Sequence, residues 1–200
     1  LYSRQHSVEG GFAFLCPYWA YIIVTVAING VVAGMVNMRE SGFLKMFTYL
    51  SGSKIAIFLS DVLSQMLLAI GEVEIFNVLY LFLFKHDDFS ILITGAVVVI
   101  ILMTYVAVSF VFFLLLPIRV GTFSIIINLY LMGMTLLLTV REPGIVGSVL
   151  SIINPIIFLS KLMTMFSNFN YLSVLYLLIA GIWFLLNFRL ISKIPISSFT

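Results

Sequence analysis

The stretch NMRESGFLKMFTYLSGSK, from Asn37 to Lys54, separates two long apolar runs and decides how the chain is organised. It holds three of the ten Lys and Arg residues. Four of its apolar residues are spaced i, i+3, i+4 and i+7, one face of a helix: Phe43, Met46, Phe47 and Leu50. We therefore predict a short amphipathic helix over about residues 40–50, lying flat at a membrane surface.

The composition places the rest of the chain in a membrane. Hydrophobic residues make up 62% of the 200 residues and charged residues only 9%, whereas a soluble domain has about 25% charged residues. The chain therefore reads as an all-α integral membrane protein with a single domain over residues 1–200. Cys16 is the only cysteine and the two histidines lie far apart, so we expect no disulfide framework and no bound metal. No nucleic-acid partner is expected.

A helix needs about 20 apolar residues to span a bilayer, and five runs are long enough. We predict spans over about 14–37, 54–84, 89–117, 121–140 and 170–189. A further apolar run, about 144–166, is interrupted by Asn154 and Pro155. We predict that it forms a re-entrant helical hairpin on the outer side, since a broken helix is tolerated at membrane depth where protein buries it. An ordinary span kinked at the proline is the alternative.

The placement of Lys and Arg favours the hairpin. If residues 37–54 are cytoplasmic and the hairpin returns to the outer side, six basic residues lie inside: Arg39, Lys45, Lys54, Arg119, Arg189 and Lys193. If the run instead crosses the membrane, only four lie inside and five outside. This orientation puts the segment from Leu1 to Pro17 outside, so we expect a further span upstream of Leu1.

Three polar side chains of the run 54–84 share one face with Lys54. Counted from Lys54 they lie at i+7, i+11 and i+18, which is one stripe of a helix: Asp61, Gln65 and Glu72. A charge at a helix centre costs about 2.5–3.5 kcal/mol on insertion scales. The stripe therefore either lines a pathway or a subunit interface, or has a structural role, with Asp61 paired near the inner surface and Glu72 reaching outer water.

The first span carries two further patterns. Gly30 and Gly34 form a G-x-x-x-G pair that lets helices approach closely. Tyr18, Trp19 and Tyr21 suit an aromatic belt at the outer interface.

The element Arg39-Glu40-x-Gly42 after the first span, the amphipathic helix and the later Asn154-Pro155 turn resemble, in order and spacing, the ATP-binding-cassette (ABC) type-two exporter permeases. The resemblance covers most of the chain. In that family the amphipathic helix is a coupling helix that docks on a separate ATPase. The resemblance therefore implies an ATPase contact through six residues: Arg39, Glu40, Gly42, Phe43, Lys45 and Met46. Within the helix, we expect Phe43 and Lys45 to face the ATPase and Phe47 to face the permease.

The resemblance implies the transmembrane subunit of an exporter that moves a lipid, peptide or drug outward across a cell membrane, such as a bacterial cytoplasmic membrane. The sequence has no phosphate-binding loop, so ATP and Mg²⁺ would be on the partner ATPase and this chain would be neither an enzyme nor a cofactor carrier. A second copy or a paralogous permease is also implied. An ion-coupled secondary transporter and a non-transporting membrane subunit remain as alternatives. A membrane enzyme is disfavoured because no catalytic motif occurs.

Overall fold

A computed structural model describes residues 2–84, 89–138, 145–165 and 171–195. These residues are helical and contain no strand. The elements are α1 (Tyr2–Val26), η1 (Ala27–Val32, π-helical), α2 (Ala33–Glu40), α3 (Phe43–Ser51), α4 (Lys54–Phe84), α5 (Ser90–Ser109), η2 (Val111–Leu115, 3₁₀), α6 (Val120–Leu137), α7 (Ile145–Ile153), α8 (Pro155–Thr164), α9 (Tyr171–Leu190) and η3 (Ile191–Lys193, 3₁₀).

Five helical segments are long and apolar enough to cross a membrane, so the chain is a multi-pass membrane protein. They are Phe12–Glu40, Lys54–Phe84, Ser90–Leu115, Val120–Leu137 and Ser173–Lys193. Each lies within a few residues of a predicted span. The predicted boundaries at 139–140 and 170, the hairpin ends at 144 and 166, and Leu1 lie outside the described residues.

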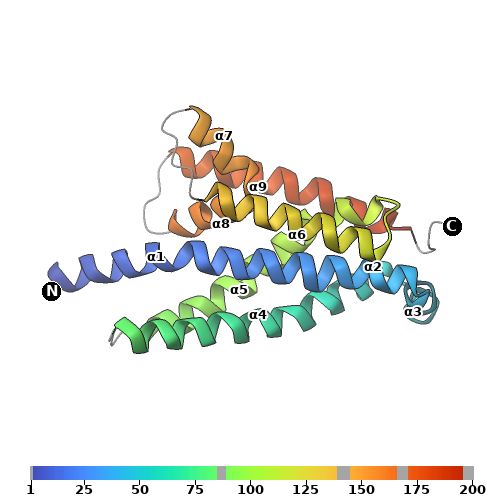
Figure 1. The fold of residues 1–200 in the computed structure, drawn as a ribbon, viewed down its shortest axis with the longest axis horizontal. Helices are drawn as coiled ribbons and strands as arrows, with labels where there is room; N and C mark the ends of the chain where they lie inside the picture. The colour runs from blue at the N-terminus through green and yellow to red at the C-terminus, as the bar shows by residue number, and fades with distance from the viewer. Residues whose placement is uncertain (1, 85–88, 139–144, 166–170, 196–200) are drawn as a thin grey trace.

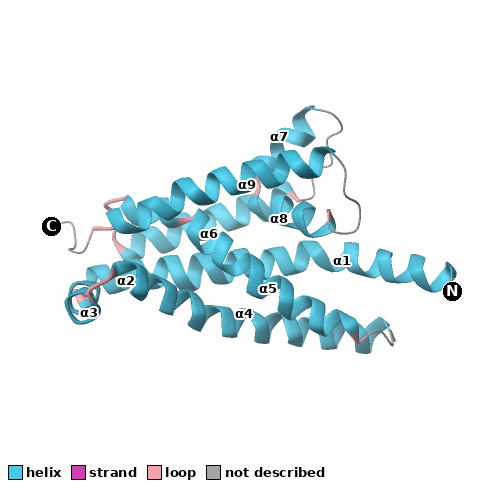
Figure 2. Ribbon diagram, turned by 180° about the vertical axis from the view of Figure 1, so that it is seen from behind, coloured by secondary structure: helices cyan, strands magenta, loops and turns pink. Residues whose placement is uncertain are grey.

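The spanning helices run along the long axis of the molecule, with α3 at one end and α7 and α8 at the other (Figures 1 and 2). The continuous helix formed by α1, η1 and α2 contacts α4, α5, α6 and α8. Its most apolar window is 56% buried and that of α5 is 50%, against 17–28% for α4, α6 and α9. The first helix and α5 therefore form the centre, and the other spans present apolar surface outward, as lipid requires.

The amphipathic helix begins at Phe43, three residues later than predicted, because Gly42 interrupts the backbone. Gly42 has φ +81° and Gly52, just after the helix, has φ +69°, a left-handed conformation that glycine adopts without steric cost. Arg39 and Glu40 consequently end α2 and are not part of α3. The Gly52 N–H donates to the Thr48 carbonyl and closes the helix.

The run 145–164 is two helices joined at Asn154, and not one kinked helix. The Asn154 Oδ1 accepts from the N–H groups of Ile156 (3.0 Å) and Ile157 (3.3 Å), which makes it the N-cap of α8, and Pro155 takes the first helical position. The Asn154 Nδ2 donates to the Met134 carbonyl at 2.8 Å and attaches the turn to α6.

Candidate functional site

Helix α3 is the most distinctive candidate because its aromatic and apolar side chains point away from the bundle. Leu44 is the one buried residue of α3, and Thr48, on the same side of the helix, is half-buried. The remaining apolar positions form what we call the α3 surface, with exposed fractions of 40–80%: Phe43, Met46, Phe47, Tyr49 and Leu50. Figures 1 and 2 show α3 nearly end-on, lying across the direction of the spans.

One detail of the predicted α3 packing is wrong. Of the predicted stripe, we expected Phe43 and Lys45 to face outward and Phe47 to pack against the rest of the chain. Phe47 is instead 40% exposed and stacks on Phe43, with ring centroids 6.1 Å apart. Leu44, which lies outside that stripe, anchors the helix instead. Lys45 is exposed, as expected.

Arg39 does not offer its charge to a partner in this structure, contrary to its predicted place among the ATPase contacts. Its side chain is only 3% exposed. Nη1 donates to the carbonyls of Leu114 (2.7 Å) and Leu116 (3.2 Å), and Nη2 donates to that of Ile118 (2.9 Å). The Leu114 carbonyl belongs to the last turn of η2, where a helix leaves carbonyls unsatisfied, and the carbonyls of Leu116 and Ile118 follow that turn. Arg39 thus caps the end of the α5–η2 segment.

Glu40 holds the other side of the same connection. Its Oε2 accepts from the Val120 N–H at 2.7 Å, at the first residue of α6. A carboxylate there satisfies a free N–H and complements the positive end of the helix dipole. Arg39 and Glu40 together fasten the end of α2 to the turn between α5 and α6. Gly42 then separates this joint from α3.

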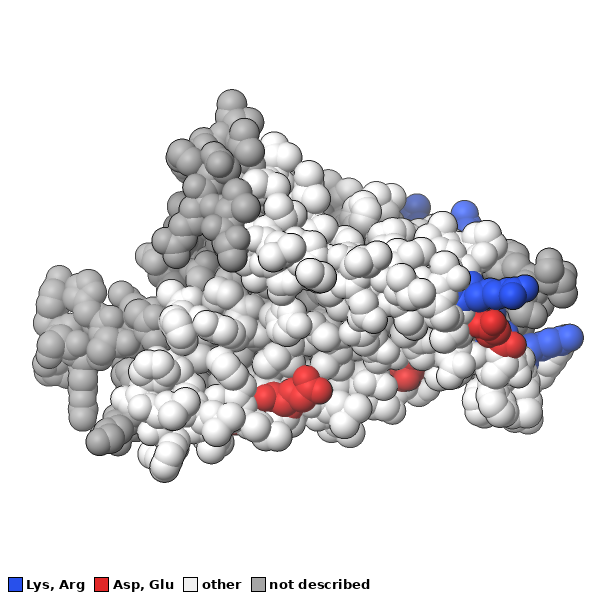
Figure 3. Space-filling model, in the orientation of Figure 1, with Lys and Arg blue, Asp and Glu red and all other residues white. Residues whose placement is uncertain are grey.

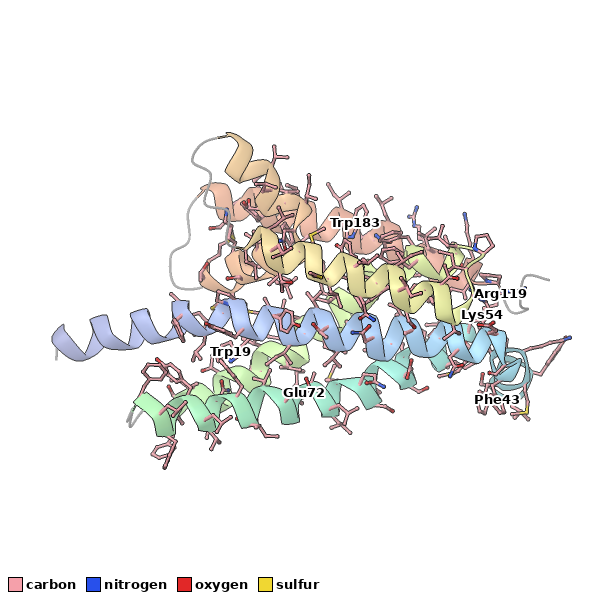
Figure 4. All side chains as sticks on the ribbon, in the orientation of Figure 1. Trp19, Phe43, Lys54, Glu72, Arg119 and Trp183 are labelled. Atoms are coloured by element: carbon pink, nitrogen blue, oxygen red, sulfur yellow. The ribbon has the colours of Figure 1, made fainter. Side chains whose placement is uncertain are left out.

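Basic residues gather at the α3 end of the bundle (Figures 3 and 4). Lys54 donates from Nζ to the carbonyls of Ile194 (2.7 Å) and Ser192 (3.3 Å), which brings the start of α4 to the end of α9 and η3. Arg119 lies in the α5–α6 turn held by Arg39. The six residues predicted to share one side therefore lie at one end. Of the other basic residues, Lys85 and Arg141 lie outside the described residues.

The predicted polar stripe of α4 is divided between two environments. Asp61 and Gln65 face the first helix at its glycines: a Cβ built on Gly34 would lie 3.3 Å from the Asp61 Oδ2, and one on Gly30 would overlap the Gln65 amide. The Asp61 Oδ2 is buried, and no described residue supplies it with a hydrogen-bond partner. Glu72, in contrast, is exposed on the outer face of α4. The predicted G-x-x-x-G pair, Gly30 and Gly34, forms the close contact between the first helix and α4.

A buried polar contact that the sequence did not indicate joins α1, α4 and α5. The Trp19 Nε1 donates to the Asn77 Oδ1 at 2.8 Å, and the Asn77 Nδ2 donates to the Ile91 carbonyl at 3.4 Å. Trp19 and Asn77 are both fully buried, so the prediction that Trp19 belongs to an interfacial belt is wrong, while Tyr18 and Tyr21 are exposed. The sequence feature that could have indicated this contact was Asn77, a polar residue within an apolar run.

Among the described residues, no group of three or more His, Cys, Asp and Glu side chains is placed to hold a metal ion. No protein-family model, curated protein or solved structure matches this chain.

Proposed function

We propose that this chain is the transmembrane subunit of an ABC exporter and that α3 is its coupling helix. A separate ATPase subunit would bind ATP and Mg²⁺, and this chain would have no catalytic site. The substrate class we propose is a hydrophobic or amphipathic molecule, a lipid, peptide or drug, moved outward across a cell membrane, such as the bacterial cytoplasmic membrane.

The exposed α3 surface is the observation that carries the proposal. Phe43 and Met46 are 52% and 46% exposed on a helix that lies across the end of the bundle, beside the basic residues that favour a cytoplasmic location. Large apolar side chains exposed in this way mark an interaction surface. An ATPase seated there would bury Phe43 and Met46 and would pair with Lys45 at the rim.

The joint formed by Arg39 and Glu40 supports a coupling role for this helix. A force on α3 reaches α2 across Gly42, and α2 is hydrogen-bonded to the turn between α5 and α6. Movement of α3 would therefore be passed to two spans distant in sequence. Arg39, Glu40 and Gly42 would transmit the movement, and Phe43, Lys45 and Met46 would contact the ATPase.

The outer face of α4 supports a second permease subunit, either another copy or a paralogue. Glu72 is exposed there between apolar side chains such as Leu68 and Ile75, which are 59% and 65% exposed. A carboxylate facing lipid alone is costly, and a neighbouring subunit with polar groups would remove that cost. In this arrangement α7 and α8 form a re-entrant hairpin at the outer side.

Ion-coupled transport is a second candidate, favoured by one observation. Within the described part of the chain, the Asp61 Oδ2 is buried beside Gly34 without a partner, and an ionisable group at membrane depth is a candidate for carrying a proton or an ion. An ATP-independent flux driven by a proton gradient and abolished in Asp61→Asn would favour this function over the exporter.

Co-purification with a candidate ABC ATPase subunit tests the exporter proposal. Phe43→Asp should weaken the complex at least roughly 30-fold, since an interface hot spot contributes about 2 kcal/mol or more. Ser53→Asp is the matched control: it adds the same charge at the same end, and Asp can replace the Ser53 Oγ that accepts from the Ala56 N–H. Unchanged complex formation and ATP hydrolysis in Phe43→Asp would show that α3 is only a surface linker.

A further inference from the structure

A cavity of about 340 Å³ lies between α5, η2, α6, the α7–α8 turn and α9. Its walls are aromatic and aliphatic, with residues from each of these elements: Tyr105, Phe112, Tyr130, Ile153, Pro155 and Trp183. Ligand pockets in proteins measure about 300–1,000 Å³ and are mostly apolar with a few polar groups. The cavity is therefore large enough for a small molecule or a segment of an aliphatic chain.

The cavity follows from the broken helix. The chain turns back at Asn154 and Pro155, so no helix continues into the space beyond the turn, and the aromatic side chains of η2 close it from the other side. The turn is held to α6 by the bond from Asn154 to the Met134 carbonyl. A 2.7 Å hydrogen bond between the Ser151 and Tyr176 hydroxyls joins α7 to α9. The walls are thus fixed before a ligand binds.

The lining restricts the chemistry of the occupant. No charged side chain lines the cavity among the described residues, and its polar groups are the hydroxyls of Tyr105, Ser109 and Tyr130 and the indole N–H of Trp183. The Ser109 Oγ already donates to the Tyr105 carbonyl at 2.8 Å. For the Tyr130 hydroxyl, the described part of the chain supplies no hydrogen-bond partner. A charged occupant would lose its hydration without compensation, whereas an apolar one with a neutral oxygen could bond Tyr130.

Three lining residues also locate the entrance. Ile152, Ile153 and Trp183 are 43%, 59% and 45% exposed, so the cavity reaches the outer surface of the bundle where spanning helices face lipid. Trp183 lies on α9 along the side of the molecule, away from both ends (Figure 4). An occupant would therefore enter sideways from the hydrocarbon and not from water.

We propose that this cavity binds an uncharged aliphatic chain from the bilayer, with a neutral hydroxyl or carbonyl oxygen hydrogen-bonded to Tyr130. The occupant could be the acyl chain of a bilayer lipid or a free single-chain molecule dissolved in the membrane. This site does not depend on the exporter proposal, because it follows from the cavity and its opening alone.

Photolabelling of the full chain in phosphatidylcholine vesicles tests the site. The probe is hexadecanol with a diazirine in its chain, and the adducts are located by mass spectrometry of peptides. We expect them to concentrate on the lining residues and to be competed by unlabelled hexadecanol. Ile179→Trp, which fills the cavity, should reduce this labelling at least tenfold. Ile182→Trp, an exposed position on the same helix outside the lining, should leave it unchanged.

Tyr130→Phe should weaken competition by hexadecanol about two- to tenfold, the value of one net hydrogen bond. Folding of each variant is checked by the protection of the buried Cys16 thiol from a maleimide. A phosphatidylcholine with the diazirine in one acyl chain separates the two sources: labelling by both probes shows a lipid acyl chain, and labelling by the alcohol alone shows a free single-chain ligand. Adducts spread evenly over the lipid-facing residues, equal in folded Ile179→Trp and Ile182→Trp, would overturn the proposal.

Discussion

Replacing Arg39 by alanine should destabilise the protein through the joint between α2 and the α5–α6 turn. A hydrogen bond from a charged donor contributes about 1.5–3 kcal/mol. Loss of the buried bond to the Leu114 carbonyl lowers the free energy of unfolding by this full amount. Loss of the part-buried bonds to Leu116 and Ile118 lowers it by only about 0.5–1 kcal/mol each, because water can replace Arg39 there. Relief from burying a charge offsets about 1 kcal/mol. The net loss is about 1.5–4 kcal/mol of the free energy of unfolding.

Cys16 provides the assay, because it is the only cysteine and is fully buried. A maleimide reacts with it only when the bundle opens, so the labelling rate follows the population of the open form when opening is fast. A loss of about 1.5–4 kcal/mol predicts labelling roughly 10- to 900-fold faster in Arg39→Ala. Arg39→Lys keeps the charge but has one nitrogen in place of two, so its rate should lie between those of wild type and Arg39→Ala.

Arg119→Ala is the control, since Arg119 is exposed in the same turn, and it should change the rate by less than about threefold. Equal labelling rates in Arg39→Ala and Arg119→Ala would refute the structural role of Arg39. If Arg39→Ala then lost its ATPase partner while its labelling rate stayed normal, Arg39 would contact that partner directly, as the sequence first indicated.

Two further predictions concern helix packing, and both are measured as thermal midpoints by circular dichroism. Gly95→Ala places a Cβ 3.0 Å from the Val73 Cγ1 and in overlap with the Asn77 amide. It should therefore lower the free energy of unfolding by about 2–3 kcal/mol, although alanine has the better helix propensity. The added Cβ of Gly133→Ala meets nothing within 4 Å, so this variant should raise the free energy of unfolding by up to about 1 kcal/mol. Equal thermal midpoints in the two variants would contradict the packing argument. Asn154→Ala removes the α8 cap and the bond to α6, at a cost of about 1–3 kcal/mol; a wild-type midpoint would show that Asn154 does not hold the turn.

The spans were predictable from sequence because membrane helices leave a strong signal. Each needs a long apolar run, and its backbone has no other way to satisfy its hydrogen bonds in lipid. The start of α3 was predicted three residues too early, because the left-handed backbone at Gly42 separates α3 from α2. The break at Asn154 was also visible, since Asn caps helices and Pro starts them.

Which face of each helix packs against the rest of the protein could not be predicted. Periodicity shows which residues share a face, but in a membrane protein an apolar face can meet lipid or protein equally well. Phe47 on α3 and Trp19 on α1 were therefore assigned to the wrong sides, and no pattern singled out Leu44 as the buried residue of α3. The role of Arg39 was hidden for a different reason: its acceptor Leu114 is 75 residues away and is a backbone carbonyl, which no side-chain pattern identifies.

Asp61 and Glu72 on α4 show how helix crossing divides a stripe that shares one face of the helix. Asp61 faces Gly34 on the first helix, whereas Asn77, farther along α4, faces Trp19. Sixteen residues rotate a straight helix by about 160° from its starting direction, so the contacting face changes along α4. Glu72 stays on the Asp61 stripe and is left outside the contact. It lies about 27 Å along the helix from Lys54, within the roughly 30 Å of hydrocarbon, and for this reason we place the second subunit of the proposed exporter over this face of α4.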